Sequence, residues 1–400
     1  MRSFISLFTG LGGLDLGLEA AGWHCLYATD IDAPAVASLK ANRGTGIGRG
    51  VKFLSDAQVE RSDIRQLEGR KLLTSVGRQR GDVEVLAGGP PCQSWSSAGH
   101  QLGFNDPRGQ MLAEYLRLAS ELDTRFLLFE NVRGLVTARG PDGRPGSALA
   151  WLREQLFARG WQTKVELLNA ADFGVPQRRV RVVLLGHRAG DEPAFPMATY
   201  SKAPMGSDLF PWRSMNEALA AIPPPSDDEV IRPTGKLALD LADIRPGSGV
   251  KSPGKAEATR PGGHWGYKQG AFVADMTLPA RTVTANAQQD WIRDPKLGLR
   301  RLSPRECAAL QTFPETWKIE GKRVDQYRQI GNAVPPLLAQ AVGQALLQSM
   351  ERRDTVAAPL KLAPLPRHLQ SAIDYTAREE RRNGDSRRTA PVRRKSKAMA

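Results

Sequence analysis

Short apolar runs alternate along the first half of the chain with longer stretches in which apolar positions recur every three or four residues. The short runs predict buried strands, and the longer stretches predict helices. Strands are expected at residues 4–8, 24–29, 83–87, 126–130, 164–169 and 181–186, and helices at residues 14–21, 33–42, 110–122 and 147–159. This alternation predicts an α/β fold with a doubly wound, mostly parallel sheet.

The pattern changes near residue 189, where proline, glycine and tryptophan become frequent and sustained periodicity is lost. Helical periodicity returns at residues 303–311 and 335–350. We therefore expect residues 1–188 to form the first part of a catalytic and cofactor-binding domain, residues 189–290 a smaller irregular domain, and residues 291–350 a segment that completes the first domain. Residues 351–400 are basic, with few aromatic residues, and are expected to be a disordered tail.

One cysteine stands at a loop signal directly after a predicted strand. The sequence Gly88-Gly89-Pro90-Pro91-Cys92 takes the chain out of the core, and polar residues follow it. A free cysteine is often a small apolar core residue. The loop and its polar neighbours favour instead a reactive thiol at Cys92.

The composition indicates a polyanionic partner and no structural metal. The net charge is +14, and the last 25 residues carry nine Lys/Arg against three Asp/Glu, so +8 belongs to the rest of the chain. A basic body favours nucleic acid over a neutral metabolite as the partner. The three cysteines, Cys25, Cys92 and Cys307, have no metal-ligand spacing, and no apolar run is long enough to span a bilayer. A soluble, cytoplasmic protein without a membrane partner is expected.

The first predicted strand ends at a glycine loop that contains Gly10, Gly12 and Gly13. An open α/β sheet binds its ligand at the carboxyl ends of its strands. Asp30, at the end of the second strand, could accept hydrogen bonds from both hydroxyls of a ribose. These features predict a nucleoside-containing cofactor, although a glycine-rich turn also serves close packing of a helix on a strand.

Six short motifs follow one another along the chain. They are Phe8-Thr9-Gly10-Leu11-Gly12-Gly13, Gly89-Pro90-Pro91-Cys92-Gln93, Phe129-Glu130-Asn131-Val132, Pro176-Gln177-Arg178-Arg179-Val180-Arg181, Arg305-Glu306-Cys307-Ala308 and Gly331-Asn332-Ala333-Val334-Pro335. In this order they resemble the motifs of C5-cytosine DNA methyltransferases of the bacterial restriction-modification type, and the resemblance covers roughly residues 3 to 348. The resemblance implies methyl transfer from S-adenosylmethionine to carbon 5 of a cytosine in double-stranded DNA.

The resemblance also assigns catalytic roles. Cys92 resembles the nucleophile that adds to carbon 6 of the base and makes carbon 5 reactive. Glu130 resembles the carboxyl group that meets the N3 and amino edge of the base. Arg181 would hold the O2 oxygen, and Arg179 would lower the pKa of the thiol. Taken singly, Glu130 could be a solvated acid at a strand end, and the two arginines a phosphate-binding basic run.

The cofactor contacts are implied position by position. Two departures from the family pattern stand out: Asp30 is shorter than the usual glutamate, and Ile31 lacks an aromatic face, so Asp32 could share the ribose role. The residues that resemble the cofactor site are Phe8, Gly10, Leu11, Gly12, Asp30, Ile31, Asp63, Ile64, Met111, Asn332, Ala333 and Val334.

A cytosine inside a duplex hides its carbon 6, so the resemblance implies that the target base is flipped out. The irregular region of residues 189–290 corresponds to the family's target-recognition domain. The DNA-contacting candidates are Gln93, Ser94, Thr282, His264, Trp265 and Lys268. The resemblance further implies a monomer associated with the nucleoid, and a cognate restriction endonuclease that acts on the same sequence without a stable complex.

Three other functions are compatible with part of the sequence. A tRNA cytosine methyltransferase of the related branch is disfavoured because a Cys-Phe-Thr tripeptide is absent and the variable region is long. A catalytically inactive DNA-binding relative is disfavoured by the intact Cys92, Glu130 and Arg181. A nucleotide-dependent oxidoreductase would rest on the glycine loop alone.

Overall fold

The computed structural model describes residues 2–91, 110–188, 192–206, 208–251, 270–351 and 362–388. Its centre is a seven-stranded sheet in the order β3-β2-β1-β4-β5-β7-β6. All neighbouring strands are parallel except that β7 runs antiparallel to both β5 and β6. The expected doubly wound, mostly parallel sheet is confirmed. Its strands are β1 (Ser3–Leu7), β2 (His24–Asp30), β3 (Gln58–Arg61), β4 (Val85–Gly88), β5 (Phe126–Val132), β6 (Gln162–Asn169) and β7 (Val180–His187).

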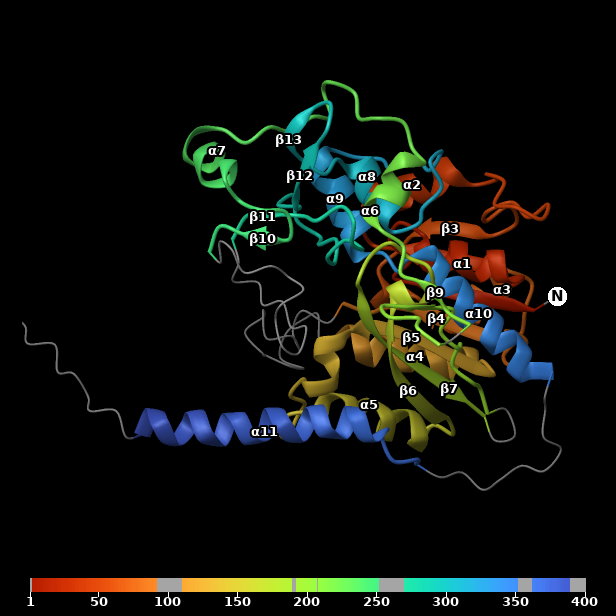
Figure 1. The fold of residues 1–400 in the computed structure, drawn as a ribbon. Helices are drawn as coiled ribbons and strands as arrows, with labels where there is room; N and C mark the ends of the chain where they lie inside the picture. Colours follow the sequence, from red (N-terminus) through yellow and green to blue (C-terminus); the bar gives the residue numbers. More distant parts are fainter. Residues whose placement is uncertain are drawn as a thin grey trace, which may run out of the picture.

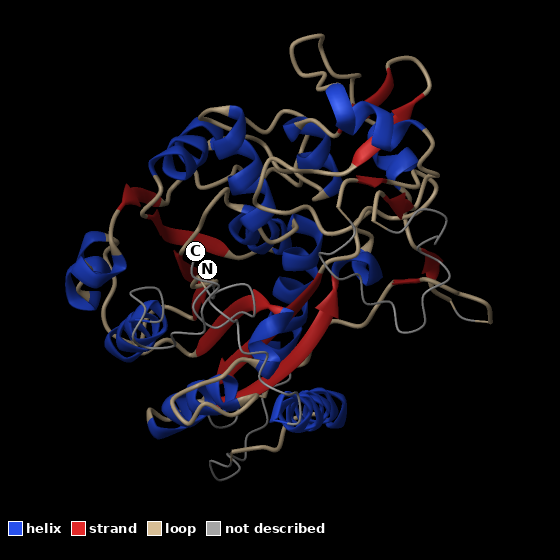
Figure 2. Cartoon of the chain, turned by 90° about the vertical axis from the view of Figure 1, so that its left-hand side faces the viewer, coloured by secondary structure: helices blue, strands red, loops and turns tan. Residues whose placement is uncertain are grey.

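Helices cover both faces of this sheet, as Figure 2 shows with helices in blue and strands in red. Phe126 and Leu128 of β5 belong to one hydrophobic core, and Leu127 and Phe129 belong to the other. Because both faces are buried, the central strand β4 and the first four residues of β5 are continuous apolar runs rather than alternating ones. One core includes residues of α1 (Gly13–Ala21), α2 (Ala33–Asn42) and α10 (Pro336–Glu351), and the other includes residues of α3 (Gly69–Ser75), α4 (Gln110–Leu122) and α5 (Ser147–Ala158).

Helix α1 packs closely against the start of α10. A Cβ atom on Gly13 would lie 2.1 Å from the carbonyl oxygen of Val334, and one on Gly17 would lie 2.4 Å from the Cβ of Ala339. Glycine is therefore required at these two positions so that the two helices can approach. This contact brings the C-terminal segment back to the glycine loop that follows β1.

The irregular region forms a smaller domain, at the upper left of Figure 1. Its four-stranded sheet has the order β10-β11-β12-β13, and Leu241, Ile244, Val273 and Trp291 form a core of its own. Two strands of this sheet lie after the predicted boundary at residue 290. The elements of this domain are α7 (Gly235–Ala242), β10 (Ser248–Gly249), β11 (Phe272–Val273), β12 (Trp291–Asp294) and β13 (Gly298–Arg301). The elements β8 (Tyr200–Ser201), β9 (Phe210–Pro211) and α6 (Met215–Ala220) precede them in the chain and lie outside this core.

Two helices follow the smaller domain and lead back to the large one. Helix α8 (Pro304–Leu310) begins with a capping box in which Ser303 and Glu306 satisfy each other's backbone amides. The buried Arg300 binds the same Glu306 carboxylate at 2.7 Å. Helix α9 (Arg323–Asn332) then ends at the segment that precedes α10.

The expectation of a disordered tail is wrong for residues 367–388, which form helix α11 (Arg367–Arg388). Leu369 is fully buried, and Leu365, Ala372 and Ile373 pack against the core that contains α5. These four residues recur every three or four positions, which is the helical period. The basic composition concealed a short apolar stripe that is sufficient to dock the helix.

No helix in the described ranges is long and apolar enough to cross a membrane. Within the same ranges, no group of three or more His, Cys, Asp or Glu side chains is placed to hold a metal ion.

Candidate active site

Two of the predicted catalytic residues meet at one end of the sheet. Glu130 lies at the carboxyl end of β5, and Arg181 lies at the start of the antiparallel β7. Because Arg181 pairs with Val132 in the sheet, its side chain projects on the same face as that of Glu130. The Arg181 Nε atom lies 3.0 Å from the Glu130 Oε1 atom.

Glu130 is 9% exposed. Burial raises the pKa of its carboxyl group above the ordinary value, and the charges of Arg181 and Arg179 act in the opposite direction. A buried carboxyl with a raised pKa can keep its proton and donate it to a bound base. The charged neighbours keep the ionised form accessible as well.

The loop after β4 lies against this carboxyl group. A Cβ atom on Gly89 would lie 3.0 Å from the Glu130 Oε2 atom, so any larger residue would crowd the carboxylate. The Asn131 Nδ2 atom donates a hydrogen bond of 3.0 Å to the carbonyl oxygen of Pro90. Sequence reasoning did not identify this bond. Cys92, Gln93 and Ser94 follow Pro91 in the sequence and lie outside the described residues.

Arg179 directly precedes β7, and its predicted effect on the pKa of the thiol concerns Cys92, which lies outside the described residues. Arg179 is 1% exposed, and its terminal nitrogens donate to three backbone carbonyls. The acceptors are Val283 at 3.0 Å, Gly331 at 2.7 Å and Ala333 at 2.8 Å. The guanidinium therefore joins the start of β7 to the end of the smaller domain and to the segment before α10.

Thr282 lies at the junction of the two domains. Its exposed side chain donates a hydrogen bond of 2.8 Å to the carbonyl oxygen of Arg178. An isolated parallel bridge pairs Gln177 with Ala280 nearby. The smaller domain is thus attached at the same end of the sheet as Glu130 and Arg181. His264, Trp265 and Lys268, which were predicted to contact DNA, lie outside the described residues.

A pocket at the carboxyl ends of β1 and β2 contains half of the predicted cofactor residues. Phe8, Asp30, Ile31, Asp63, Ile64 and Met111 line it together with Leu7, Thr29 and Ser62. The last three were missed by sequence reasoning. Each directly precedes a residue that was identified, at the end of a strand or in the loop after it, and this adjacency is the signal that could have found them.

Asp30, which was predicted to accept hydrogen bonds from a ribose, is hydrogen-bonded to two backbone amides. Its Oδ2 atom accepts a hydrogen bond of 2.8 Å from the Gly10 amide, and its Oδ1 atom accepts one of 2.9 Å from the Asp32 amide. Each carboxylate oxygen has a second lone pair for a further donor. Burial raises the pKa of Asp30. Asp32 instead pairs with Arg328 of α9 at 3.0 Å and does not line the pocket, so the structure favours Asp30 for this role.

The glycine loop has the backbone that such a pocket requires. Gly10 has a φ of 58° and Gly12 a φ of 83°, both in the left-handed region. Leu11 is fully buried in the core. Among the C-terminal residues, Val334 lies against Gly13, Ala333 binds Arg179, and the Asn332 side chain is exposed.

Asp63 begins the short helical turn η1 (Ile64–Gln66) and accepts a hydrogen bond from the Arg65 amide at 3.0 Å. Its carboxylate also forms an ion pair of 2.5 Å with the Arg65 side chain. This pairing lowers the pKa of Asp63. Asp63 therefore faces the pocket as a carboxylate that already has one cationic partner.

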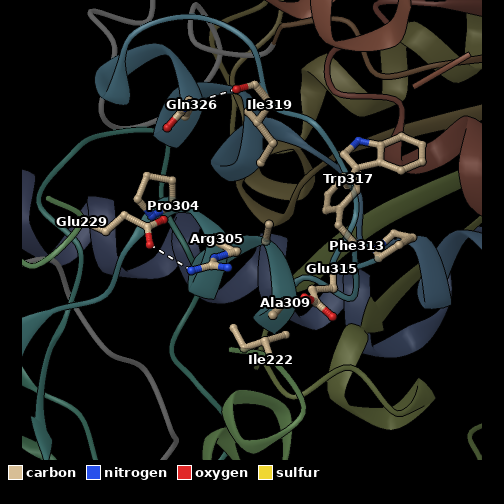
Figure 3. A pocket seen from close by; sticks show the side chains of 12 residues that line it. Ile222, Glu229, Pro304, Arg305, Ala309, Phe313, Glu315, Trp317, Ile319 and Gln326 are labelled. Carbon is tan, nitrogen blue, oxygen red and sulfur yellow. Dashed lines mark hydrogen bonds and ion pairs between the residues drawn. The ribbon is translucent and has the colours of Figure 1, made fainter. Parts of the chain in front are cut away.

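A second hollow lies between α8, α9 and the segment around Glu229 (Figure 3). Phe313, Trp317 and Ile319 give it an apolar wall, and Glu229 pairs with Arg305 at its rim at 2.9 Å. None of the predicted catalytic or cofactor residues lines it. We assign it no part in the chemistry.

Three comparisons place these features among known proteins. The family model described as C-5 cytosine-specific DNA methylase matches residues 2–348. The chain is 31% identical to the Type II methyltransferase M1.HphI of Haemophilus parahaemolyticus, over 86% of this chain and 87% of that protein, and 28% identical to M.FnuDI of Fusobacterium nucleatum, over 88% and 96%. The Entamoeba histolytica methyltransferase EhMeth has a similar fold, with a TM-score of 0.62 at 14% identity, over 88% of this chain and 99% of that one.

Proposed function

This chain belongs to the C-5 cytosine-specific DNA methylase family. From that premise we propose how its residues methylate DNA and which kind of DNA is its substrate. The enzyme is a DNA cytosine-5 methyltransferase. We propose that its substrate is one specific double-stranded sequence. The observation that carries the proposal is the arrangement of Glu130, Arg181 and the Gly89-Pro90 loop, which lie together at the end of the sheet to which the smaller domain is attached.

The family and fold imply dependence on S-adenosylmethionine, and the pocket at the ends of β1 and β2 fits such a group. Apolar side chains form its walls, and Asp30 offers free lone pairs beside the glycine loop. Phe8, Ile31, Ile64 and Met111 would hold the adenosine part, Asp30 the ribose and Asp63 the adenine edge. The segment of Asn332, Ala333 and Val334 would close the site beside Gly10, Leu11 and Gly12. When bound, the cofactor supplies an electrophilic methyl group.

The thiolate of Cys92 would add to carbon 6 of a flipped-out cytosine, forming a sulfur–carbon bond and moving the ring π electrons toward carbon 5. Glu130 would give its proton to N3 and so take up the negative charge that develops in the ring. Arg181 would donate to O2 of the base while holding the Glu130 carboxylate in place. After carbon 5 gains the methyl group, loss of its proton to a base, for which water is suitable, lets the sulfur–carbon bond break and restores the thiolate. N3 then returns its proton to the Glu130 carboxylate.

Two further residues would position this machinery. Asn131 holds the carbonyl of Pro90, two residues before the nucleophile in the sequence. Arg179 would act mainly by joining three backbone segments, while its charge favours the anionic forms of nearby groups. We thus propose a positioning role for Arg179 in addition to its predicted effect on the thiol.

Recognition of the target sequence would lie in the smaller domain. Thr282 at the junction, Gln93 and Ser94 after the nucleophile, and His264, Trp265 and Lys268 are the candidates for DNA contact. Since the relatives M1.HphI and M.FnuDI are named Type II methyltransferases, we propose that this enzyme protects DNA in a restriction-modification system. We propose further that it acts in the cytoplasm at the nucleoid as a monomer, with a cognate endonuclease that forms no stable complex with it.

The alternative substrate is tRNA, as in the related RNA branch of the fold. Transfer of a radiolabelled methyl group to unmethylated duplex DNA and to tRNA separates the two. Label in DNA, followed by bisulfite sequencing that locates the methylated cytosine in one recurrent sequence, is the expected result. Label in tRNA alone, or methylation of cytosines without any sequence preference, would contradict the proposal.

A further inference from the structure

Helix α11 lies outside the region matched by the family model, which ends at residue 348. It is nevertheless firmly attached to the large domain. Leu369 is fully buried, and a Cβ atom on Gly146 would lie 2.8 Å from the Cδ1 atom of Ile373. The His368 Nε2 atom lies 2.7 Å from the Glu166 Oε1 atom, and Glu380 forms an ion pair with Arg139. The helix has a fixed direction because these contacts are spread over several of its turns.

This direction takes α11 past the catalytic end of the sheet. Glu166 of β6 lies opposite Val183 of β7, and Val183 lies opposite Glu130 of β5. Arg139 follows the turn η3 (Arg133–Thr137), which begins where β5 ends. Beyond Glu380 the helix continues to Arg388, which adds roughly 12 Å at 1.5 Å per residue. In Figure 1 this outer part projects beyond the large domain, on the same side of the molecule as the smaller domain.

Among its described side chains, the second half of α11 carries three exposed arginines. Arg381 and Arg382 lie just beyond Glu380, and Arg378 lies three and four residues before them, so the three are neighbours on the helix. Arg382 pairs with Glu379 at 3.4 Å, which is a surface ion pair of small energy that a phosphate can replace. From Arg387 to Ala400 the sequence adds six Lys/Arg and no Asp/Glu.

We propose that α11 is a DNA-contacting arm, whose arginines bind the phosphates of the duplex beside the target site. The inference rests on the proposed function, because it takes duplex DNA as the substrate. A duplex held between the end of the sheet and the smaller domain extends past both, and α11 passes that end from below in Figure 1. Contacts to phosphates add affinity that does not depend on sequence and that weakens as salt rises.

The test replaces Arg378, Arg381 and Arg382 together with glutamine in the full chain. The matched control replaces three exposed cations of the opposite edge of the molecule, Lys71, Arg78 and Arg80, two of which also form surface ion pairs. Binding of a duplex that contains the methylated sequence is measured for wild type and both variants across a salt series. Helix content and thermal stability are measured in parallel, because cations near a helix C-terminus also stabilise the helix itself.

The arm variant should show a log-log salt slope that is smaller in magnitude by about 0.9 for each arginine that contacts a phosphate. Its methylated sequence and its kcat at saturating DNA should stay those of wild type, and the control slope should not change. An unchanged slope in the arm variant, or an equal change in the control, would overturn the inference while wild-type DNA methylation still supports the proposed function. Failure of wild type to methylate DNA would instead reject the proposed function.

Discussion

At the scale of single residues, the site depends on side chains whose surroundings give them properties that their type alone does not. Glu130 is the main example, because burial raises its pKa while two arginines lie close enough to oppose that rise. The six motifs could predict that Glu130 and Arg181 meet only through the family resemblance. Arg181 lies at the start of its strand, and it reaches the carboxyl end of β5 only because β7 runs antiparallel to β5. The motifs could not predict the partners of Arg179, whose acceptors are 104 to 154 residues away in sequence.

Replacing Glu130 by glutamine tests the proton-donating role. The Glu130→Gln variant should lose roughly two to four orders of magnitude in kcat, because an amide cannot supply the proton. Its affinity for S-adenosylmethionine should be unchanged, since Glu130 does not line the cofactor pocket. In wild type, kcat should fall as pH rises through the raised pKa of Glu130, and the variant should lack that limb. A variant with the turnover and pH profile of wild type would contradict the assignment.

Replacing Arg179 by methionine tests its positioning role. The change leaves three buried carbonyl groups without donors, and each costs about 1–3 kcal/mol. The free energy of unfolding, measured by urea denaturation, should therefore fall by roughly 3 kcal/mol or more. Arg65→Met serves as the control, because its side chain is half exposed and a surface ion pair such as that with Asp63 adds little to stability. Equal losses in the two variants would show that Arg179 does not join the segments.

At the scale of elements, the strands that form the site were predictable and the docked tail was not. β4 is an apolar run that ends at a glycine loop, and β5 begins with an apolar run that is followed by Glu130 near the end of the strand. Both could therefore be identified as strands from the sequence, and their ends could be located. The short strand β3 has the sequence Gln-Val-Glu-Arg and carries no such signal. Helix α11 was missed because its apolar stripe is narrow and lies within a strongly charged segment.

Helix α1 contains two buried carboxyl groups that should make stability depend on pH. Burial raises the pKa of Asp15 to about 7 and that of Glu19 to about 8. Both groups bind their protons more tightly in the folded state, so their contribution to stability is complete at low pH and is lost as pH rises through these values. Asp15→Asn removes one of the two groups.

The free energy of unfolding of Asp15→Asn should therefore rise relative to that of wild type as the pH increases from 5 to 8. The control is Asp227→Asn at an exposed position outside α1, and its difference from wild type should change less over the same range. Chemical denaturation at several pH values measures both. A constant difference for Asp15→Asn would mean that this carboxyl group titrates normally in the folded protein.

At the scale of the whole molecule, the chain places its chemistry in one domain and, by our proposal, its sequence recognition in the other. The loss of periodicity near residue 189 was sufficient to predict a second domain. Its end was less predictable, because β12 and β13 lie beyond the predicted boundary at residue 290 but join the smaller sheet, β12 by pairing with β11 and β13 by pairing with β12. Only long-range pairing assigns them to the smaller sheet.

Exchange of the smaller domain tests this division. Replacing residues 193–301 with the equivalent region of a relative keeps the four-stranded sheet intact. The hybrid should methylate the relative's target sequence by the same chemistry, as bisulfite sequencing would reveal. An active hybrid that still methylates the original sequence would place recognition elsewhere.

The most direct test of the central claim is covalent trapping of Cys92 on a duplex that carries 5-fluorocytosine at the methylated position. Fluorine cannot leave carbon 5 as a proton does, so the sulfur–carbon bond should persist in wild type, survive denaturation and be located on the Cys92 peptide by mass spectrometry. Cys92→Ala should form no adduct and have no turnover, yet still bind S-adenosylmethionine. Near-normal methylation by Cys92→Ala, or an active wild type that forms no adduct, would contradict the account.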